Sequence, residues 1–237
     1  MMVGMEIVID APGKNALSTS SMESLLAAIE AAKGEPLLFT GALGSGAFSA
    51  GLNLKEVVAL DRAGMRRFLA TLDRLVEAIY MYPAPTVAYV NGHAIAGGCV
   101  LALCCDESVA EDDPTIRIGL NETALGLPFP PRVLAMVQRT VRPAVLERVV
   151  LGAELFDVTE AARLGLVDAV ARDGRKTAEE RLAHLASHPR AIYAHTKGVL
   201  RAGTFDVGAA QADFEARLEP IWTGPELRAR IAARLAR

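Results

Sequence analysis

The stretch that most constrains this chain covers residues 91–106 and reads NGHAIAGGCVLALCCD. Asn91-Gly92 and Ala96-Gly97-Gly98 precede an uncharged apolar run, which is typical of a buried helix that begins just after a strand. No Ser, Thr, Asp or Asn stands at the expected N-cap, so the first N–H groups of this helix have no side-chain acceptor. Such groups favour negative charge, and small residues allow close approach of a ligand. The alternative is that the glycines only pack the helix tightly on a sheet.

Length, composition and charge narrow the class of protein. The chain has 237 residues, of which 51% are hydrophobic, as expected for a globular protein with a substantial core. A formal net charge of −3 argues against a nucleic-acid-binding protein, which usually carries a basic surface. The longest uncharged apolar stretch, residues 94–105, is too short to cross a bilayer, and no signal-peptide pattern is present. We therefore expect no membrane association and a cytoplasmic location.

The three cysteines are Cys99, Cys104 and Cys105, all inside or beside the apolar run. An odd, clustered set in an apolar segment predicts reduced core residues rather than disulfides. No His or acidic residue lies at zinc-like spacing from them, so the sequence predicts no metal site.

The first half of the chain alternates strand and helix patterns. Runs rich in β-branched residues predict strands at residues 5–9, 36–40, 86–90, 108–110 and 115–119. Apolar residues at helical spacing predict helices over residues 22–29 and 65–79. This alternation is typical of an α/β fold with largely parallel strands. Residues 41–51 form a loop of small residues that is long enough to be functional.

The second half of the chain is mainly helical. Helices are predicted from residue 133, over 144–151 and over 159–164, with a short strand at 165–170. Gly174 marks a candidate boundary, and the chain from residue 176 onward is almost wholly helical. Leu227, Ile231 and Leu235 give the last helix a narrow apolar stripe, which we expect to be buried against a neighbouring element or another subunit.

Three sequence blocks carry a resemblance to a known family. They are FSAGLNLK at residues 48–55, NGHA with AGGC at residues 91–99, and GLVD at residues 165–168. In this order and spacing the chain resembles the enoyl-CoA hydratase/isomerase (crotonase) superfamily. The resemblance implies a spiral of ββα turns over residues 1–174. It also implies a helical region over residues 175–237 that assembles trimers, or dimers of trimers.

The ligand implied by the resemblance is a coenzyme A thioester of fatty acid metabolism, with coenzyme A as part of the substrate and no separate cofactor. The family pattern places the oxyanion hole at the backbone N–H groups of Ala50 and Gly97. Removing a proton next to a thioester puts negative charge on its oxygen, and one such donor contributes about 3 kcal/mol in the transition state.

The acidic residues divide the superfamily by reaction. Hydratases carry two glutamates, and in this chain the two corresponding positions are Val100 and Glu122. With one carboxylate, efficient hydration is not expected, but a single base can take a proton from one carbon and return it to another. The segment IGLNET at residues 118–123 resembles mitochondrial-type Δ3,Δ2-enoyl-CoA isomerases. Apolar neighbours are expected to raise the pKa of Glu122; the alternative is a solvated loop acid.

The resemblance also suggests substrate contacts. They are Leu52, Lys55, Gly98, Leu125 and Lys197, with Lys197 matching a family lysine that reaches coenzyme A. Lys55, Arg66 and Arg67 are candidates for the phosphates, although a solvated helix face is the alternative for the two arginines.

Other residues near the motifs have structural interpretations. His93 is expected to be a satisfied structural residue rather than a catalytic one. Asp106 and Glu107 are expected to hold backbone groups or cap a turn. The string LPFPP at residues 127–131 departs from the glycines of many hydratases and predicts a reshaped acyl pocket.

The leading hypothesis is a cofactor-free isomerase that converts 3-enoyl-CoA into 2-enoyl-CoA. One alternative is another reaction of the superfamily, namely hydration, thioester hydrolysis or decarboxylation. A second alternative is a non-catalytic paralogue that binds acyl-CoA.

Overall fold

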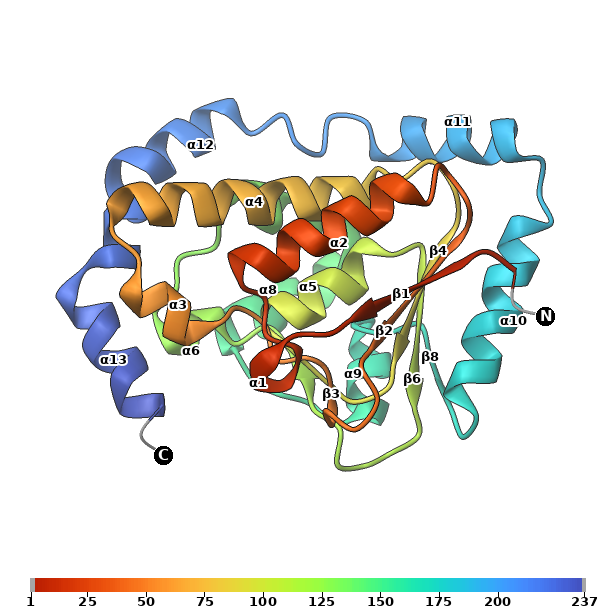
Figure 1. Ribbon diagram of the computed structural model, residues 1–237, viewed down its shortest axis with the longest axis horizontal. Coiled ribbons are helices and arrows are strands. Elements are labelled where there is room, and N and C mark those ends of the chain that lie inside the picture. The colour runs from red at the N-terminus through yellow and green to blue at the C-terminus, as the bar shows by residue number, and fades with distance from the viewer. Residues whose placement is uncertain (1–2, 236–237) are drawn as a thin grey trace.

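Two parallel sheets form the frame of the fold in the computed structural model, which describes residues 3–235. In the larger sheet the strand order is β1-β2-β4-β6-β8 (Figure 1). Its strands are β1 (Met5–Ile9), β2 (Leu37–Gly41), β4 (Thr86–Val90), β6 (Glu107–Glu111) and β8 (Ala169–Ala171). The smaller sheet contains β3 (Ala47–Ser49), β5 (His93–Ile95) and β7 (Ile118–Gly119). All neighbouring strands are parallel, which confirms the predicted α/β class.

Helices follow most of the strands in the first two thirds of the chain. They are α1 (Pro12–Asn15), α2 (Thr19–Ala31), α3 (Leu54–Ala59), α4 (Arg62–Tyr80), α5 (Gly97–Cys104), α6 (Glu122–Leu125), α7 (Pro131–Thr140), α8 (Pro143–Gly152) and α9 (Val158–Leu164). The predicted apolar stripe of α4 is buried. Ser18 caps α2 through a reciprocal pair of hydrogen bonds with Ser21, which satisfies two N–H groups at the start of that helix.

The C-terminal third is helical, as predicted. It contains α10 (Gly174–Ala186), α11 (Arg190–Arg201), α12 (Gly208–Asp213), a π-helix at Phe214–Leu218, a 3₁₀-helix at Glu219–Thr223 and α13 (Pro225–Leu235). Figure 1 shows α10 at the right of the molecule, α11 and α12 along its top, and the chain then turning past the N-terminal end of α4 to reach α13.

The larger sheet is covered on both faces. The main core packs α2, α4 and α5 against one face, and α5 is buried along its whole length. On the other face, Ala178 and Leu182 of α10 pack against Leu38, Val87 and Val109. The expected boundary at Gly174 therefore falls at the start of a helix that completes the sheet packing.

Three local details differ from the sequence prediction. The small-residue loop at 41–51 contains β3, which is too short to show a strand pattern. The strand predicted at 115–119 forms only at Ile118–Gly119. The strand predicted at 165–170 begins at Ala169, because Gly165 adopts a φ of 77° and ends α9 in a left-handed cap.

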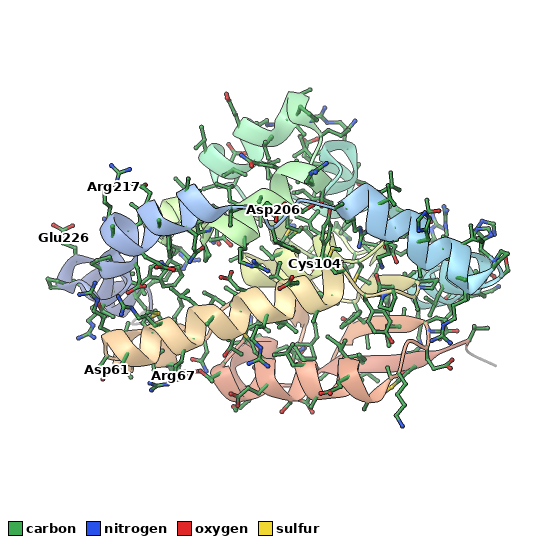
Figure 2. The ribbon with its side chains drawn as sticks, turned by 90° about the horizontal axis from the view of Figure 1, so that it is seen from above. Asp61, Arg67, Cys104, Asp206, Arg217 and Glu226 are labelled. Carbon is green, nitrogen blue, oxygen red and sulfur yellow. The ribbon has the colours of Figure 1, made fainter. Side chains whose placement is uncertain are left out.

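The three cysteines are buried and free, as predicted, and Cys104 lies in the interior of the molecule (Figure 2). Within the described part of the chain, no helix has the length and apolar character needed to cross a membrane.

The C-terminal helix α13 buries its apolar stripe within its own chain. Leu227 and Ile231 are 3% and 1% exposed, and α13 packs against α3 and α6 (Figure 1). Leu235 is 45% exposed. The neighbour that covers most of this stripe is therefore the same subunit, and α13 reaches the segment that carries Glu122.

Candidate active site

The two residues predicted for the oxyanion hole and the two positions that correspond to the hydratase glutamates line one cavity of about 230 Å³: Ala50, Gly97, Val100 and Glu122. They come from the segment after β3, from α5 and from α6. The remaining wall is mostly apolar and includes Leu52, Leu125 and Phe129. The fold therefore brings three separate sequence blocks to one pocket.

Glu122 is the first residue of α6 and is 8% exposed. Its Oε2 atom has no hydrogen-bond partner among the described residues. Burial raises the pKa of Glu122 to about 7, because desolvation penalises the charged carboxylate. The side chain is thus a buried carboxyl group poised to exchange a proton near neutral pH, rather than a solvated loop acid.

The short helix that carries Glu122 is fixed at both ends. The hydroxyl of Thr123 donates to the carbonyl oxygen of Val150 at 2.9 Å, and the N–H of Leu127 donates to the carbonyl oxygen of Glu122 at 3.0 Å. Gly126 ends the helix in a left-handed conformation with a φ of 74°. These contacts hold the carboxyl group against the pocket wall.

Val100 lies one turn inside α5, is 1% exposed and lines the same cavity. Among the described lining residues, Glu122 is the acidic one. The pocket therefore presents one carboxyl group, with an aliphatic side chain at the position where the hydratase pattern has a second glutamate.

The backbone of Ala50 does not fit its predicted role. Its N–H donates to the carbonyl oxygen of Lys14 at 3.0 Å, so this group is already used and is not free to bind a thioester oxygen. Lys14 adopts a left-handed conformation with a φ of 64°, which a local sequence pattern does not reveal. The prediction that Ala50 supplies an oxyanion-hole donor is therefore corrected.

Leu52 has the free N–H group in this segment. A bridge to Leu17 uses the carbonyl of Gly51 and the N–H of Asn53, at 2.7 and 2.9 Å, and leaves the N–H of Leu52 without a partner among the described residues. Leu52 lines the cavity, as its predicted substrate contact requires. In this parallel bridge the hydrogen bonds are made by Gly51 and Asn53, the residues on either side of Leu52. The free N–H group therefore belongs to Leu52, two residues after Ala50.

Gly97 begins α5, and Ala96 at its N-cap makes no side-chain hydrogen bond, as predicted. In the described part of the chain the N–H of Gly97 has no acceptor. Gly51 lies against it: a Cβ atom added to Gly51 would be 3.0 Å from the nitrogen of Gly97. Two unused backbone donors, on Leu52 and Gly97, therefore border the cavity from adjoining segments.

Gly98 has a packing role. It is buried, and a Cβ atom there would collide with the carbonyl oxygen of Ser49, so only glycine lets α5 pack on β3. Gly98 does not line the cavity. Gly97 thus has the free N–H group expected at the start of the helix, whereas Gly98 packs the helix tightly on the sheet, as the alternative interpretation predicted.

Lys55 lines a second cavity of about 280 Å³, which shares Ala50, Leu52 and Leu54 with the first. Lys55 is exposed and stands at the start of α3. The shared residues show that the two cavities adjoin, and the lining of the second includes an exposed cation.

Lys197 lies outside both cavities. Its Nζ donates to Asp106 Oδ2 at 2.8 Å and to the carbonyl oxygen of Ala84 at 3.2 Å, and the side chain is 7% exposed. Asp106 also accepts from the N–H of Thr86 at 2.8 Å and pairs with Arg201. Burial lowers the pKa of Lys197 to about 8 despite the attraction of Asp106. Asp106 thus holds backbone, as expected, and Lys197 serves it as a buried partner.

His93, Arg66 and Arg67 also lie away from the pocket. Nδ1 of His93 accepts from the N–H of Arg117 at 3.0 Å, and burial lowers its pKa, which supports the structural interpretation. Arg66 pairs with Glu219, and the side chain of Arg67 points outward from α4 (Figure 2).

Two C-terminal residues in the cavity wall were not predicted. Trp222, the only tryptophan of the chain, lines the pocket and is 1% exposed, and Arg234 of α13 lines it as well. No motif marks them, because they reach the pocket only when the C-terminal segment folds over α3 and α6. The one feature of the sequence that could have drawn attention to Trp222 is that the chain has a single tryptophan.

The family model described as enoyl-CoA hydratase/isomerase matches residues 4–221. The chain therefore belongs to the enoyl-CoA hydratase/isomerase family, as the sequence blocks predicted.

Relatives in this family carry more than one activity in their names. Human mitochondrial enoyl-CoA delta isomerase 1 is 30% identical over 209 residues, which cover 86% of this chain and 69% of the human protein. The mouse enzyme of the same name is 32% identical over 177 residues, which cover 72% of this chain and 60% of that protein. A protein of Rhodobacter capsulatus, described as a probable enoyl-CoA hydratase, is 34% identical and covers 90% of this chain and 83% of its own length.

Solved structures confirm the crotonase-type fold. The crystal structure of human mitochondrial Δ3-Δ2-enoyl-CoA isomerase has a TM-score of 0.88 at 27% identity, covering 95% of this chain and 90% of that one. Enoyl-CoA hydratase from Bacillus halodurans has a TM-score of 0.84 at 23% identity, covering 96% and 95%, and supports the fold alone. The names of the human and mouse relatives include a mitochondrial location, so the expected cytoplasmic location stays a prediction.

Proposed function

We propose that this protein is an enoyl-CoA isomerase that shifts the double bond of a 3-enoyl-CoA to the 2-position. The observation that carries the proposal is the pairing of Val100 with Glu122 in one cavity. Addition of water calls for an acid and a base, whereas a proton shift needs a single group that first accepts and then donates.

The proposed reaction uses Glu122 for both proton transfers. Its carboxylate takes a proton from C2 of the thioester, and the electron pair moves toward the carbonyl oxygen to give a dienolate. The N–H groups of Leu52 and Gly97 stabilise that oxygen, at about 3 kcal/mol for each well-placed donor. The protonated Glu122 then delivers the proton to C4, which leaves the conjugated 2-enoyl-CoA and restores the carboxylate.

The pKa of Glu122 suits this sequence. A group whose pKa lies near the working pH can both remove a proton and give it back without a large penalty in either direction. Burial has raised the pKa to about 7. An ordinary exposed glutamate would be a weaker base and would hold the proton too briefly to return it efficiently.

The coenzyme A portion is placed in the second cavity, which adjoins the pocket at Ala50, Leu52 and Leu54 and has Lys55 in its lining. In this arrangement the acyl group occupies the buried pocket, and the exposed ammonium group of Lys55 faces the phosphates.

The proposal includes assembly as a trimer or a dimer of trimers. Helix α11 exposes Ile192, Val199 and Leu200 at 64%, 63% and 72%. Apolar side chains clustered on one helix are a common mark of a subunit interface. Light scattering on the purified protein distinguishes a trimer from a hexamer, and a monomer would contradict this part of the proposal.

The deciding experiment offers wild type and Glu122→Gln a panel of 3-enoyl-, 2-enoyl-, hydroxyacyl- and malonyl-type CoA esters, with products followed by mass spectrometry. We expect 2-enoyl-CoA from 3-enoyl-CoA in wild type and a loss of at least a hundredfold in the variant, with binding of CoA esters retained. Glu226→Gln is the matched control, because Glu226 is exposed at the start of α13 (Figure 2).

Other products identify the competing reactions. Formation of 3-hydroxyacyl-CoA as the main product favours hydration, the activity named for several relatives. Release of free CoA or carbon dioxide favours thioester hydrolysis or decarboxylation. Binding without turnover of any ester identifies a non-catalytic acyl-CoA-binding protein.

A further inference from the structure

Strand β1 leaves one side of its backbone unpaired. It is the end strand of the larger sheet and has β2 as its neighbour (Figure 1). The N–H of Met5 and the carbonyl oxygen of Ile9 bond to residues that flank β2, at 2.8 and 3.0 Å. Alternate residues of a strand bond to the same neighbour in a parallel pair. The backbone groups of Glu6 and Val8 therefore face the open side, where no partner lies among the described residues.

The other sheet edges are protected in ways that are usual for β proteins. At the far end of the larger sheet, β8 has three residues, and β3 in the smaller sheet also has three. An antiparallel bridge between Ile118 and Phe156, with two N–H···O bonds of 2.9 Å, covers β7. Strand β1 has five residues, and its sequence MEIVI contains no proline or lysine. Among the described strands, β1 therefore has the length and composition to receive another strand.

The surroundings of β1 leave room for that strand. Val8 is 46% exposed, although it lies within the strand. A cavity of about 130 Å³ is lined by residues 6–10 and by four residues of α2: Ser21, Ser24, Leu25 and Ala28. Consecutive residues of a strand point to opposite faces of the sheet. A lining that includes all of residues 6–10 therefore places this hollow along the open side of the strand.

The acidic residues determine how two copies of β1 can pair. Copies related by a twofold axis run antiparallel, and the outward-facing Glu6 and Val8 must form the hydrogen-bonded pairs. An axis at Glu6 would place two Glu6 carboxylates opposite each other, and an axis at Val8 would place Glu6 opposite Asp10, which is unfavourable. An axis at Ile7 places Glu6 opposite Val8, so no two acids meet. Arg175 of the same chain also holds the Glu6 carboxylate, at 2.9 and 3.0 Å.

We propose that β1 joins two copies of this chain edge to edge, antiparallel and centred on Ile7, so that their larger sheets become continuous. Each pairing of Glu6 with Val8 exchanges two backbone hydrogen bonds, and the axis relates two such pairings. This contact does not depend on the proposed reaction. It is also separate from the contact proposed for α11, and it makes the number of subunits in the assembly even.

Light scattering on wild type, Val8→Pro and Val8→Thr tests the contact. Proline removes the outward-facing N–H of Val8, which the pairing of β1 with β2 does not use, so the chain should still fold. We expect the molar mass of Val8→Pro to be half that of wild type, with an unchanged circular dichroism spectrum. Val8→Thr keeps the N–H group and a β-branched side chain, so it is the matched control and should keep the wild-type mass.

Cysteine cross-linking tests the register without breaking the assembly. Two Ile7 residues on the axis would have Cα atoms about 4.5 Å apart, so Ile7→Cys should form a disulfide-linked dimer in dilute, oxidising solution. Ile7 is 2% exposed, which prevents linking by chance collision, and the native cysteines are buried. Val8→Cys is the control, because two Val8 residues would lie diagonally, about 7–8 Å apart, beyond the reach of a disulfide.

The outcomes separate the β1 contact from the α11 contact. A wild-type dimer supports β1 and contradicts α11, a trimer does the reverse, and a hexamer that Val8→Pro splits into trimers supports both. Equal masses of wild type and folded Val8→Pro, or no linked dimer with Ile7→Cys, overturn the pairing of two copies. Preferential linking through Val8→Cys overturns the register. An edge of β1 occupied by a segment of another protein also overturns the proposal, because that protein would co-purify in place of the second copy.

Discussion

The backbone N–H of Ala50 donates to the carbonyl oxygen of Lys14 at 3.0 Å, at the start of the segment that carries Gly51 and Leu52. This bond anchors the chain just before Gly51, whose φ of +83° turns the backbone. The next residue, Leu52, then has its N–H free beside Gly97. The donor pair proposed for the thioester oxygen thus depends on one glycine.

Replacing Gly51 by alanine should disrupt that pair. An added Cβ would lie 2.7 Å from the carbonyl oxygen of Ile95 and 3.0 Å from the nitrogen of Gly97, in a conformation unfavourable for alanine. We expect kcat to fall at least a hundredfold, as for the loss of one oxyanion donor. Steady-state kinetics and thermal unfolding measure the two effects.

Gly44→Ala is the matched control for this variant. Gly44 has a φ of +80°, but an added Cβ there would meet nothing within 4 Å. The control carries the same kind of backbone strain and should lose about 1 kcal/mol of stability with turnover intact. An active Gly51→Ala enzyme would refute the proposed placement of the donors.

The pH dependence of turnover should follow Glu122. The reaction begins with the carboxylate, and burial raises the pKa of Glu122 to about 7. We expect kcat/KM to rise with pH through a midpoint near 7 and to fall about tenfold per pH unit well below it. A midpoint near 4.5, or a flat profile from pH 5 to 8, would argue against a buried base.

The same residue should make the fold less stable as pH rises. Between the unfolded value of 4.5 and about 7, the folded state binds more protons than the unfolded state, so the free energy of unfolding falls with increasing pH. Glu122→Gln removes this loss and should be more stable than wild type at pH 8, by about 3 kcal/mol. Denaturant unfolding at pH 5 and pH 8 measures the difference, which should shrink at the lower pH.

Val100→Glu tests whether the missing second carboxylate defines the reaction. The new side chain would face Glu122 in the same cavity and supply the paired acid and base for hydration. We expect at least tenfold more 3-hydroxyacyl-CoA from 2-enoyl-CoA than with wild type, and a raised pKa for the carboxyl pair. Val100→Gln, which lacks the titrating group, should form none of this extra product. A folded Val100→Glu without hydration would show that more than one residue separates the two reactions.

Lys197→Met should affect stability rather than binding. Removing one member of a buried ion pair usually costs about 3–5 kcal/mol, and the contact of Asp106 with Arg201 should keep the loss at the lower end of this range. KM for acyl-CoA should not change. Lys176→Met, at an exposed lysine of α10, is the control and should leave both quantities unchanged. A raised KM with normal stability would instead support the contact with coenzyme A implied by the family pattern.

Much of the fold was predictable because its elements follow local rules. The stripe of α4, the strand at Thr86–Val90 and the uncapped start of α5 all appear in windows of fewer than about twenty residues. β3 was missed because three residues are too few to show alternation. Gly165 ended a helix where a strand was expected, since its left-handed conformation is a property of the backbone rather than of the apolar pattern.

The candidate site divides in the same way. The groups available to the site could be read from the sequence: Glu122, an aliphatic residue at position 100, and glycines before a buried helix without a cap. These are residue identities at fixed spacings, which a family pattern detects directly. Which of these groups are free to act depends on contacts made in the folded chain. The N–H of Ala50 donates to the carbonyl oxygen of Lys14, and Lys197 forms an ion pair with Asp106, which is 91 residues away in the sequence.

Only the tertiary structure brought Trp222 into the pocket. Its position depends on the C-terminal segment folding back and on Glu219 pairing with α4, and neither contact leaves a periodic trace in the sequence. The physical reason is the range of the interactions. Burial patterns and caps are local and are encoded by neighbouring residues, whereas hydrogen-bond partners and cavity walls are shared between distant segments and exist only once the chain has folded.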